Sequence, residues 1–129
     1  MAVAAFAAGE LITAGEAVYV SGDGFLYKAS AADIASAQTA GIAIDTGNAG
    51  TLIRVNADAI YYGYTNLTPG EGHYLSVATS GLIVAYSGWQ EEFNTNAGTA
   101  YLQFVGRAIS SSGVEVELSP PVQMNYPLP

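Results

Sequence analysis

The 129-residue chain contains no cysteine, which excludes disulfide bonds and any metal or redox chemistry that needs a thiolate. It has one histidine, His73, and lacks the G-x-S-x-G, H-E-x-x-H and P-loop spacings. An active site needs several reactive groups that converge, and this sequence offers few of them. We therefore expect a protein that is not an enzyme and that holds no cofactor and no metal.

Positive charge is also scarce. The only basic residues are Lys28, Arg54 and Arg107, against 11 acidic ones, and the formal net charge is −8. Such a chain cannot neutralise a run of phosphates and is repelled by anionic lipid, so we expect neither nucleic acid nor a membrane as partner. Charged residues make up only 11% of the chain, so we expect a surface of small polar and apolar side chains, or one that a partner covers.

Long apolar runs are missing as well. No stretch approaches the roughly 20 apolar residues that span a bilayer. The apolar start of the chain has no basic segment before it and ends at Glu10, so residues 1–9 are interpreted as an N-terminal arm and not as a signal peptide. Residues 120–129 hold four of the five prolines, which predicts an extended tail. Apolar side chains alternate along that tail, as if one side lay on a partner: Val122, Met124, Tyr126 and Leu128.

An internal repeat organises the rest of the chain. ITAGEAVYVS at residues 12–21 and LTPGEGHYLS at residues 67–76 share five of ten residues without a gap. A weaker match follows each copy, for example AGIAID and VGRAIS. We predict one domain over residues 10–119, built from two half-repeats at about 10–58 and 66–119 and related by a pseudo-twofold axis.

Each half-repeat has the pattern of β structure. Apolar and polar residues alternate in short segments such as AVYVS, TLIRV and VEVEL, and turn sequences separate them. TAGE and TPGE are typical of type II turns, with Pro69 at the first central position and Gly15 or Gly70 at the second, where φ is positive. The only helical piece we expect lies within residues 30–40. The pattern predicts an all-β fold, a small sandwich or barrel.

The residues that could carry chemistry are few. Glu16 and Glu71 occupy matching positions and would form the only paired acid and base. Each follows a turn glycine, however, where a glutamate more often binds turn amides or faces water. We interpret His73 as an ordinary strand residue. The acidic loops around Asp23 and residues 45–48 leave weak calcium binding as an alternative, although neither has the density of an EF-hand loop.

The aromatic residues are more informative. A cluster of three tyrosines, Tyr61, Tyr62 and Tyr64, stands between the half-repeats, and the insert at residues 87–99 has no counterpart in the first copy. Tyrosine and tryptophan suit protein interfaces and sugar stacking, and core filling is the alternative. The interface candidates are Phe6, Tyr61, Tyr62, Tyr64, Trp89, Phe93, Met124, Tyr126 and Leu128.

The strings TAGEAVYVS-GDG, LYKAS, AGIAID, LTPGEGHYLS, VGRAIS and VEVEL together resemble a family of tailed-bacteriophage virion proteins. This family contains small head decoration (cement) proteins and related modules of head or tail fibres. The resemblance covers residues 9–119 and implies a compact β module, which in the cement members forms trimers over the gaps between capsid subunits. It carries over no functional residue. The chain has no collagen-like or coiled-coil stretch and no separate particle-anchoring domain, which favours a decoration protein over a fibre.

The expected function follows from composition and resemblance together. We expect a homotrimer on the outer capsid surface of the virion, made in the host cytoplasm, that binds the major capsid protein and stabilises the expanded head against internal pressure. Its two ends would be arms, and the insert around Trp89 would lie at a contact. The alternative is a receptor- or glycan-binding module of a fibre that uses Trp89 and the tyrosine cluster for stacking. A third alternative is a cell-wall hydrolase that uses Glu16 and Glu71.

Overall fold

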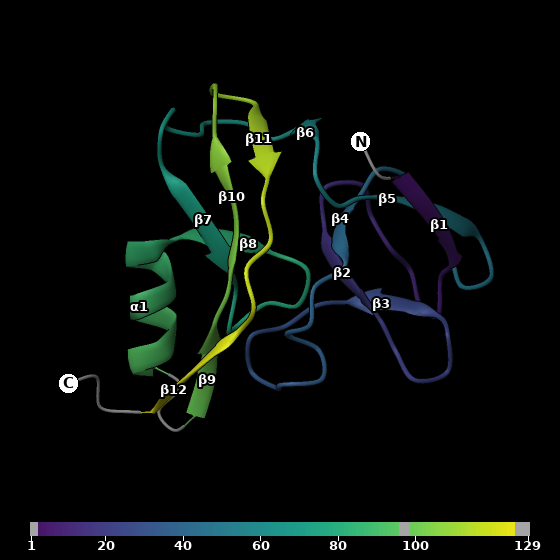
Figure 1. The fold of residues 1–129 in the computed structure, drawn as a ribbon, viewed down its shortest axis with the longest axis horizontal. Helices are drawn as coiled ribbons and strands as arrows, with labels where there is room; N and C mark the ends of the chain where they lie inside the picture. Colours follow the sequence, from purple (N-terminus) through teal and green to yellow (C-terminus); the bar gives the residue numbers. More distant parts are fainter. Residues whose placement is uncertain (1–2, 96–98, 126–129) are drawn as a thin grey trace.

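The computed structural model describes residues 3–95 and 99–125. Within them the chain forms two five-stranded antiparallel sheets, a two-stranded sheet and a ten-residue helix (Figure 1). The first sheet contains β1 (Val3–Ala7), β2 (Ala17–Val20), β3 (Leu26–Lys28), β4 (Gly41–Ala43) and β5 (Leu52–Asn56). The second contains β6 (Ile60–Tyr62), β7 (Gly72–Leu75), β8 (Ile83–Ala85), β10 (Phe104–Ala108) and β11 (Gly113–Val116). Helix α1 (Tyr86–Thr95) follows β8, and β9 (Thr99–Leu102) pairs with β12 (Val122–Asn125).

The two five-stranded sheets have the same topology. Their strand orders are β1-β5-β4-β2-β3 and β6-β11-β10-β7-β8, so each strand of one sheet has an equivalent in the other. The registers agree too, because Tyr19 lies opposite Tyr27 in β2–β3 and Tyr74 lies opposite Val84 in β7–β8. The all-β prediction is confirmed. Both sheets remain open, so of the two predicted architectures the closed barrel is wrong.

The repeated turns have the predicted geometry. In each copy the glutamate amide donates to a threonine carbonyl three residues earlier, at 3.1 Å in both the Thr13–Glu16 and the Thr68–Glu71 turn. The glycine before each glutamate has positive φ, 97° at Gly15 and 89° at Gly70. The Glu16 carboxylate also accepts a hydrogen bond of 2.6 Å from the Thr13 amide, so this glutamate binds its own turn as expected.

The equivalent faces of the two sheets have different surroundings. We call the face that carries Leu26 in the first sheet and Ile83 in the second the inner face, and the face of Tyr19 and Tyr74 the outer face. The inner face of the first sheet packs into its own core: Ala8, Ile12, Val18, Leu26, Ala43, Ile53 and Val55. The inner face of the second sheet packs instead against the outer face of the first, in a shared core: Ala17, Ala29, Ala31, Ala37, Ile42, Leu75, Ile83, Val105, Val114 and Val116. Unlike faces meet, so the expected pseudo-twofold relation is wrong and the halves stack head to tail.

The helix lies where the sequence did not predict one. Residues 30–40 form turns with a single helix-like bond, from the Ala37 amide to the Asp33 carbonyl at 2.9 Å, and Ala31 and Ala37 serve as small fillers of the shared core. Helix α1 instead covers the outer face of the second sheet (Figure 1). Trp89 and Phe93, four residues apart, turn its apolar side toward that sheet. The Glu92 carboxylate anchors it by accepting bonds from the Ser76 hydroxyl and Val77 amide at 2.8 and 2.9 Å.

Both ends of the described chain are extended, but they pair within the molecule. The segment predicted as a free N-terminal arm supplies β1, which pairs with β5 from Val3 opposite Asn56 to Ala7 opposite Leu52. The described part of the tail supplies β12. Each of these two strands has one partner strand within the chain, so over the described residues neither end is a free arm. Tyr126 and Leu128 lie outside the described residues.

The repeated turns allow a matched test of the backbone. Gly70→Ala places a Cβ in open space at positive φ, so it should lower the free energy of unfolding by roughly 1 kcal/mol through backbone strain alone. Gly15→Ala should cost at least as much, because its Cβ would lie 3.3 Å from the Tyr61 hydroxyl. Urea unfolding measures both. Gly22→Ala, in open space without positive φ, is the control and should change stability by less than about 0.5 kcal/mol.

Candidate functional site

The two aromatic residues of the insert are core residues. Trp89 is 0% exposed and Phe93 1% exposed, and their rings stack with centroids 5.1 Å apart. The Trp89 indole nitrogen donates to the Tyr101 carbonyl at 3.1 Å. The prediction that these two side chains lie at a partner contact is therefore wrong, because sheet and helix already cover them. The spacing of four residues was the sequence signal for this burial.

The three neighbouring tyrosines have different roles. Tyr61 and Tyr64 are half-buried and meet edge to face with ring centroids 5.1 Å apart. The Tyr64 hydroxyl donates to the Gly15 carbonyl at 2.7 Å, which ties the second half to the first turn, and burial raises the pKa of both phenols. Tyr62 points outward and is 61% exposed. Only Tyr62 of this cluster is available to a partner.

The remaining described candidates pack inside the chain. Phe6 on β1 packs against the core of the first half, and Met124 on β12 packs against the core beneath α1. Tyr62 is thus the one described candidate that remains well exposed. It shares one side of β6 with Ile60, which is 40% exposed and two residues away.

A cleft of about 570 Å³ lies between the two halves. Three separate segments form it: the first turn, the segment after β6, and the stretch from Thr79 through β8, with His73 also in its wall. Its lining residues are Ala14, Gly15, Glu16, Gly63, Tyr64, Thr65, Leu67, His73, Thr79, Ser80, Gly81, Leu82, Ile83, Val84 and Ala85. Most are small or apolar. The sequence analysis missed this cleft, and its only signal was a histidine at a position where the first half has the core residue Val18.

The cleft brings together two of the residues considered for chemistry. His73 is 5% exposed, and its Nδ1 lies 3.2 Å from the Glu71 carbonyl oxygen. The Glu16 carboxylate is bound to its own turn. Glu71, the proposed partner of Glu16 in an acid–base pair, is not among the residues that line the cleft. The wall of the cleft therefore contains one carboxylate and one imidazole.

A row of aromatic rings crosses the outer face of the second sheet. Tyr74 lies between Tyr86 and Phe104, with ring centroids 5.6 and 5.5 Å away. The Arg107 guanidinium stands over the Phe104 ring, 5.9 Å from its centroid. Tyr86 is 40% exposed, and its ring also stacks on Trp89. This row combines flat apolar surface with a cation.

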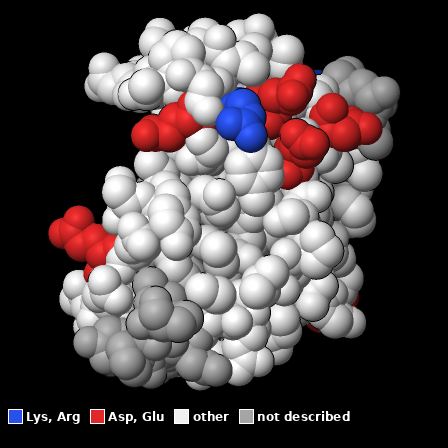
Figure 2. Space-filling view, turned by 60° about the vertical axis from the view of Figure 1, so that its left-hand side comes forward, with Lys and Arg blue, Asp and Glu red and all other residues white. Residues whose placement is uncertain are grey.

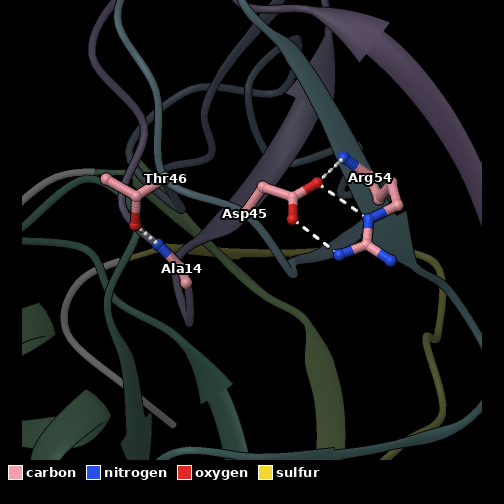
Figure 3. Close-up of polar contacts among 4 residues, drawn as sticks. All are labelled: Ala14, Asp45, Thr46 and Arg54. Atoms are coloured by element: carbon pink, nitrogen blue, oxygen red, sulfur yellow. Dashed lines mark hydrogen bonds and ion pairs between the residues drawn. The ribbon is translucent and has the colours of Figure 1, made fainter.

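The two acidic loops use their carboxylates inside the chain. Asp23 accepts from the Phe25 amide and the Tyr27 hydroxyl at 2.9 and 2.7 Å, which lowers the pKa of Asp23. Asp45 binds the Arg54 guanidinium through both oxygens at 2.8 and 3.0 Å, and this lowers its pKa to about 2 (Figure 3). Among the described residues, no three acidic or histidine side chains form a group that could hold a metal ion.

On one face of the molecule, charge is concentrated in a small area (Figure 2). Figure 2 shows acidic side chains gathered around one basic side chain in the upper part of one face, while most of that face carries no charge. Within residues 3–95 and 99–125, the structure has no helix with the length and hydropathy that crossing a membrane requires. No family model matches the chain, and a search of curated proteins finds no match.

The burial of the only tryptophan gives a direct test. We expect blue-shifted Trp89 emission that iodide does not quench until the protein unfolds, because the indole is 0% exposed. Trp89→Ala should cost roughly 3–5 kcal/mol of stability, whereas Tyr62→Ala should stay within about 0.5 kcal/mol. Native-state quenching equal to that of free tryptophan would contradict the placement of α1.

The Asp45–Arg54 pair predicts a pH dependence. The pKa of Asp45 falls from 3.8 to about 2 on folding, so the pair stabilises the fold above pH 3.8 and this contribution is lost as the pH falls through about 2. Asp45→Asn should therefore reduce stability at neutral pH and match the wild type at the acid end. Denaturant unfolding at several pH values, in a double-mutant cycle with Arg54→Gln, measures the coupling. A coupling that does not change with pH would show that the ion pair contributes nothing.

Proposed function

We propose that the chain is a structural protein of a tailed-bacteriophage virion, a decoration protein that binds the outside of the expanded head as a homotrimer. Its role is mechanical and not catalytic, because it binds the lattice of the major capsid protein and stabilises the expanded head. A protein that binds only the expanded lattice adds its binding free energy to the stability of that state. The sequence resemblance over residues 9–119 is the first support.

The observation that carries the proposal is the edge strand β6. It pairs with β11 on one side only, and it contains no charged residue or proline. Soluble proteins normally protect such an edge with charges, proline or a covering segment. Here Ile60 and Tyr62 are instead 40% and 61% exposed. An uncharged edge with exposed isoleucine and tyrosine is typical of a surface that another subunit covers.

The distribution of charge supports the same class of partner. Of the three basic residues, Arg54 is paired with Asp45, and Arg107 donates to the Gly70 carbonyl at 3.0 Å. This arrangement does not favour a polyanionic partner. It favours contact with a protein surface through apolar and small polar groups.

A second candidate function has one specific observation in its favour. The aromatic row of Tyr86, Tyr74 and Phe104, with Arg107 beside it, offers the flat rings and the cation that sugar recognition uses. A glycan-binding module of a phage fibre would use this row. Of the residues expected to stack on a glycan, Trp89 is buried, and Tyr62 is the well-exposed member of the tyrosine cluster.

The deciding experiment mixes the purified protein with expanded heads that were assembled without it. We expect saturable cosedimentation near three copies per lattice site, a raised melting temperature of the heads and a trimeric mass of the bound form. Tyr62→Lys should abolish binding because it places a charge on the uncharged edge. The matched control is Leu52→Lys, on β5 of the first half, where the leucine is 67% exposed and the change should have no effect.

Two outcomes would contradict the proposal. If Tyr62→Lys binds heads as well as the wild type does, β6 is not the contact. If the wild type does not bind heads but does bind glycans, and a Tyr74→Ala variant loses that binding, the fibre module is the better assignment.

A further inference from the structure

The first half of the molecule fills a place that the second half leaves open. In the first half, residues 8–10 lie along the free side of β3, where Ala8 forms a parallel bridge with Leu26. The Gly9 amide donates to the Leu26 carbonyl at 2.8 Å, and the Glu10 carboxylate accepts from the Lys28 amide at 2.9 Å. This segment closes the inner face of the first sheet.

The equivalent segment of the second half, residues 63–65, turns away from β8. The amides of Gly63 and Tyr64 donate to the Ser112 carbonyl at 3.1 and 3.2 Å, and the Tyr64 side chain reaches the first half. The cleft of about 570 Å³ lies between this segment and β8, because residues 63–65 form one wall and β8 another. In the part of the chain that the structure describes, no segment lies where residues 8–10 lie in the first half.

The edge of β8 has the geometry to accept a strand. Ile83 lies opposite Leu75 in the β7–β8 hairpin, as Leu26 lies opposite Val20 in the β2–β3 hairpin. At the next pair of each hairpin a backbone hydrogen bond of 2.9 Å joins the strands, from the Ser76 amide to the Leu82 carbonyl and from the Ser21 amide to the Phe25 carbonyl. Hydrogen bonds alternate along antiparallel strands, so the backbone groups of Ile83 face away from β7, as those of Leu26 face away from β2. The Ile83 carbonyl therefore occupies the position of the carbonyl that accepts from Gly9.

We propose that this cleft is a strand-addition site for an extended, uncharged segment of another protein chain. The segment lies parallel to β8, donates an amide to the Ile83 carbonyl and places an apolar side chain on the floor of the cleft. Leu67 and Ile83 provide that floor at the positions of the core residues Ile12 and Leu26. Ala8, which bridges to Leu26 and is 1% exposed, packs against this core in the first half and shows that the site accepts a small apolar side chain.

Charge specifies the occupant further. Glu16 is the one charged side chain among the described residues that line the cleft, and it disfavours an acidic segment. The Lys28 amide, which donates to the Glu10 carboxylate in the first half, has the Ala85 amide as its equivalent in β8, and an uncharged acceptor such as an amide or hydroxyl oxygen of the segment can take that place. The inference does not rest on the proposed role in the virion, since it follows from the two halves of one chain.

The chain supplies its own probe for this site. The peptide Ac-VAAFAAG-NH₂, which repeats residues 3–9 without charge, is titrated into the ¹⁵N-labelled full chain. We expect saturable binding, with amide shifts confined to residues 14–16, 63–67, 73 and 79–85. The same peptide with Gly9→Pro lacks the amide that bonds the strand edge, and it should bind about tenfold more weakly. Ala14→Trp in the protein fills the cleft mouth and should abolish binding, whereas Ala35→Trp, exposed and outside the cleft, should not.

Each alternative outcome overturns a defined part of the proposal. No saturable binding, or shifts centred on β6, would exclude strand addition at β8. Equal affinity of the Gly9→Pro peptide would reduce the site to an apolar cleft without backbone pairing. A concentration-dependent dimer of the wild type that Ala14→Trp dissociates would show that a second copy is the occupant. Head binding by the Ala14→Trp variant, measured in parallel, separates failure at this site from failure of the proposed function.

Discussion

The rest of the structure depends on one constraint, which is that each five-stranded sheet has two apolar faces that must be covered. The first sheet covers its inner face with its own residues 8–10 and a small core around Ile12 and Leu26. Its outer face, with Tyr19, is covered by the inner face of the second sheet. That arrangement leaves the outer face of the second sheet without a partner from either half. Because burial of apolar area is the dominant favourable term in folding, a further element has to cover it.

Helix α1 meets this requirement, which explains why the insert occurs in only one half. Tyr19 in the first sheet and Tyr74 in the second are equivalent, yet the first packs in the shared core and the second beneath the helix. Trp89 and Phe93 cover the face of the second sheet that a third half-repeat would cover in a longer stack. Terminal units of repeat proteins carry such caps for the same reason. The asymmetry of the sequence therefore marks the end of a stack, where Trp89 and Phe93 are core residues.

These relations also explain what the sequence could and could not predict. Local turn chemistry predicted the positive φ of Gly15 and Gly70, and alternation predicted the strands, because both depend on near neighbours. The helix was misplaced because residues 30–40 have high helix propensity, while the real helix is stabilised by contact with a distant sheet. The cleft was missed because its walls come from three segments. The alignment of the half-repeats places His73 at the position of Val18. This difference indicates a cleft only once the position is known to face the interior.

The cleft beside β8 is the place where head-to-tail stacking leaves this requirement incomplete. In the first half, β1 runs on into the segment that closes the inner face beside β3. In the second half, β6 is followed by Gly63 and Tyr64, whose bonds to Ser112 and Gly15 draw the chain toward β11 and the first turn. The same displacement opens the cleft beside β8. The second half therefore lacks the covering segment that residues 8–10 provide in the first half, whereas β6, like its equivalent β1, pairs on one side only.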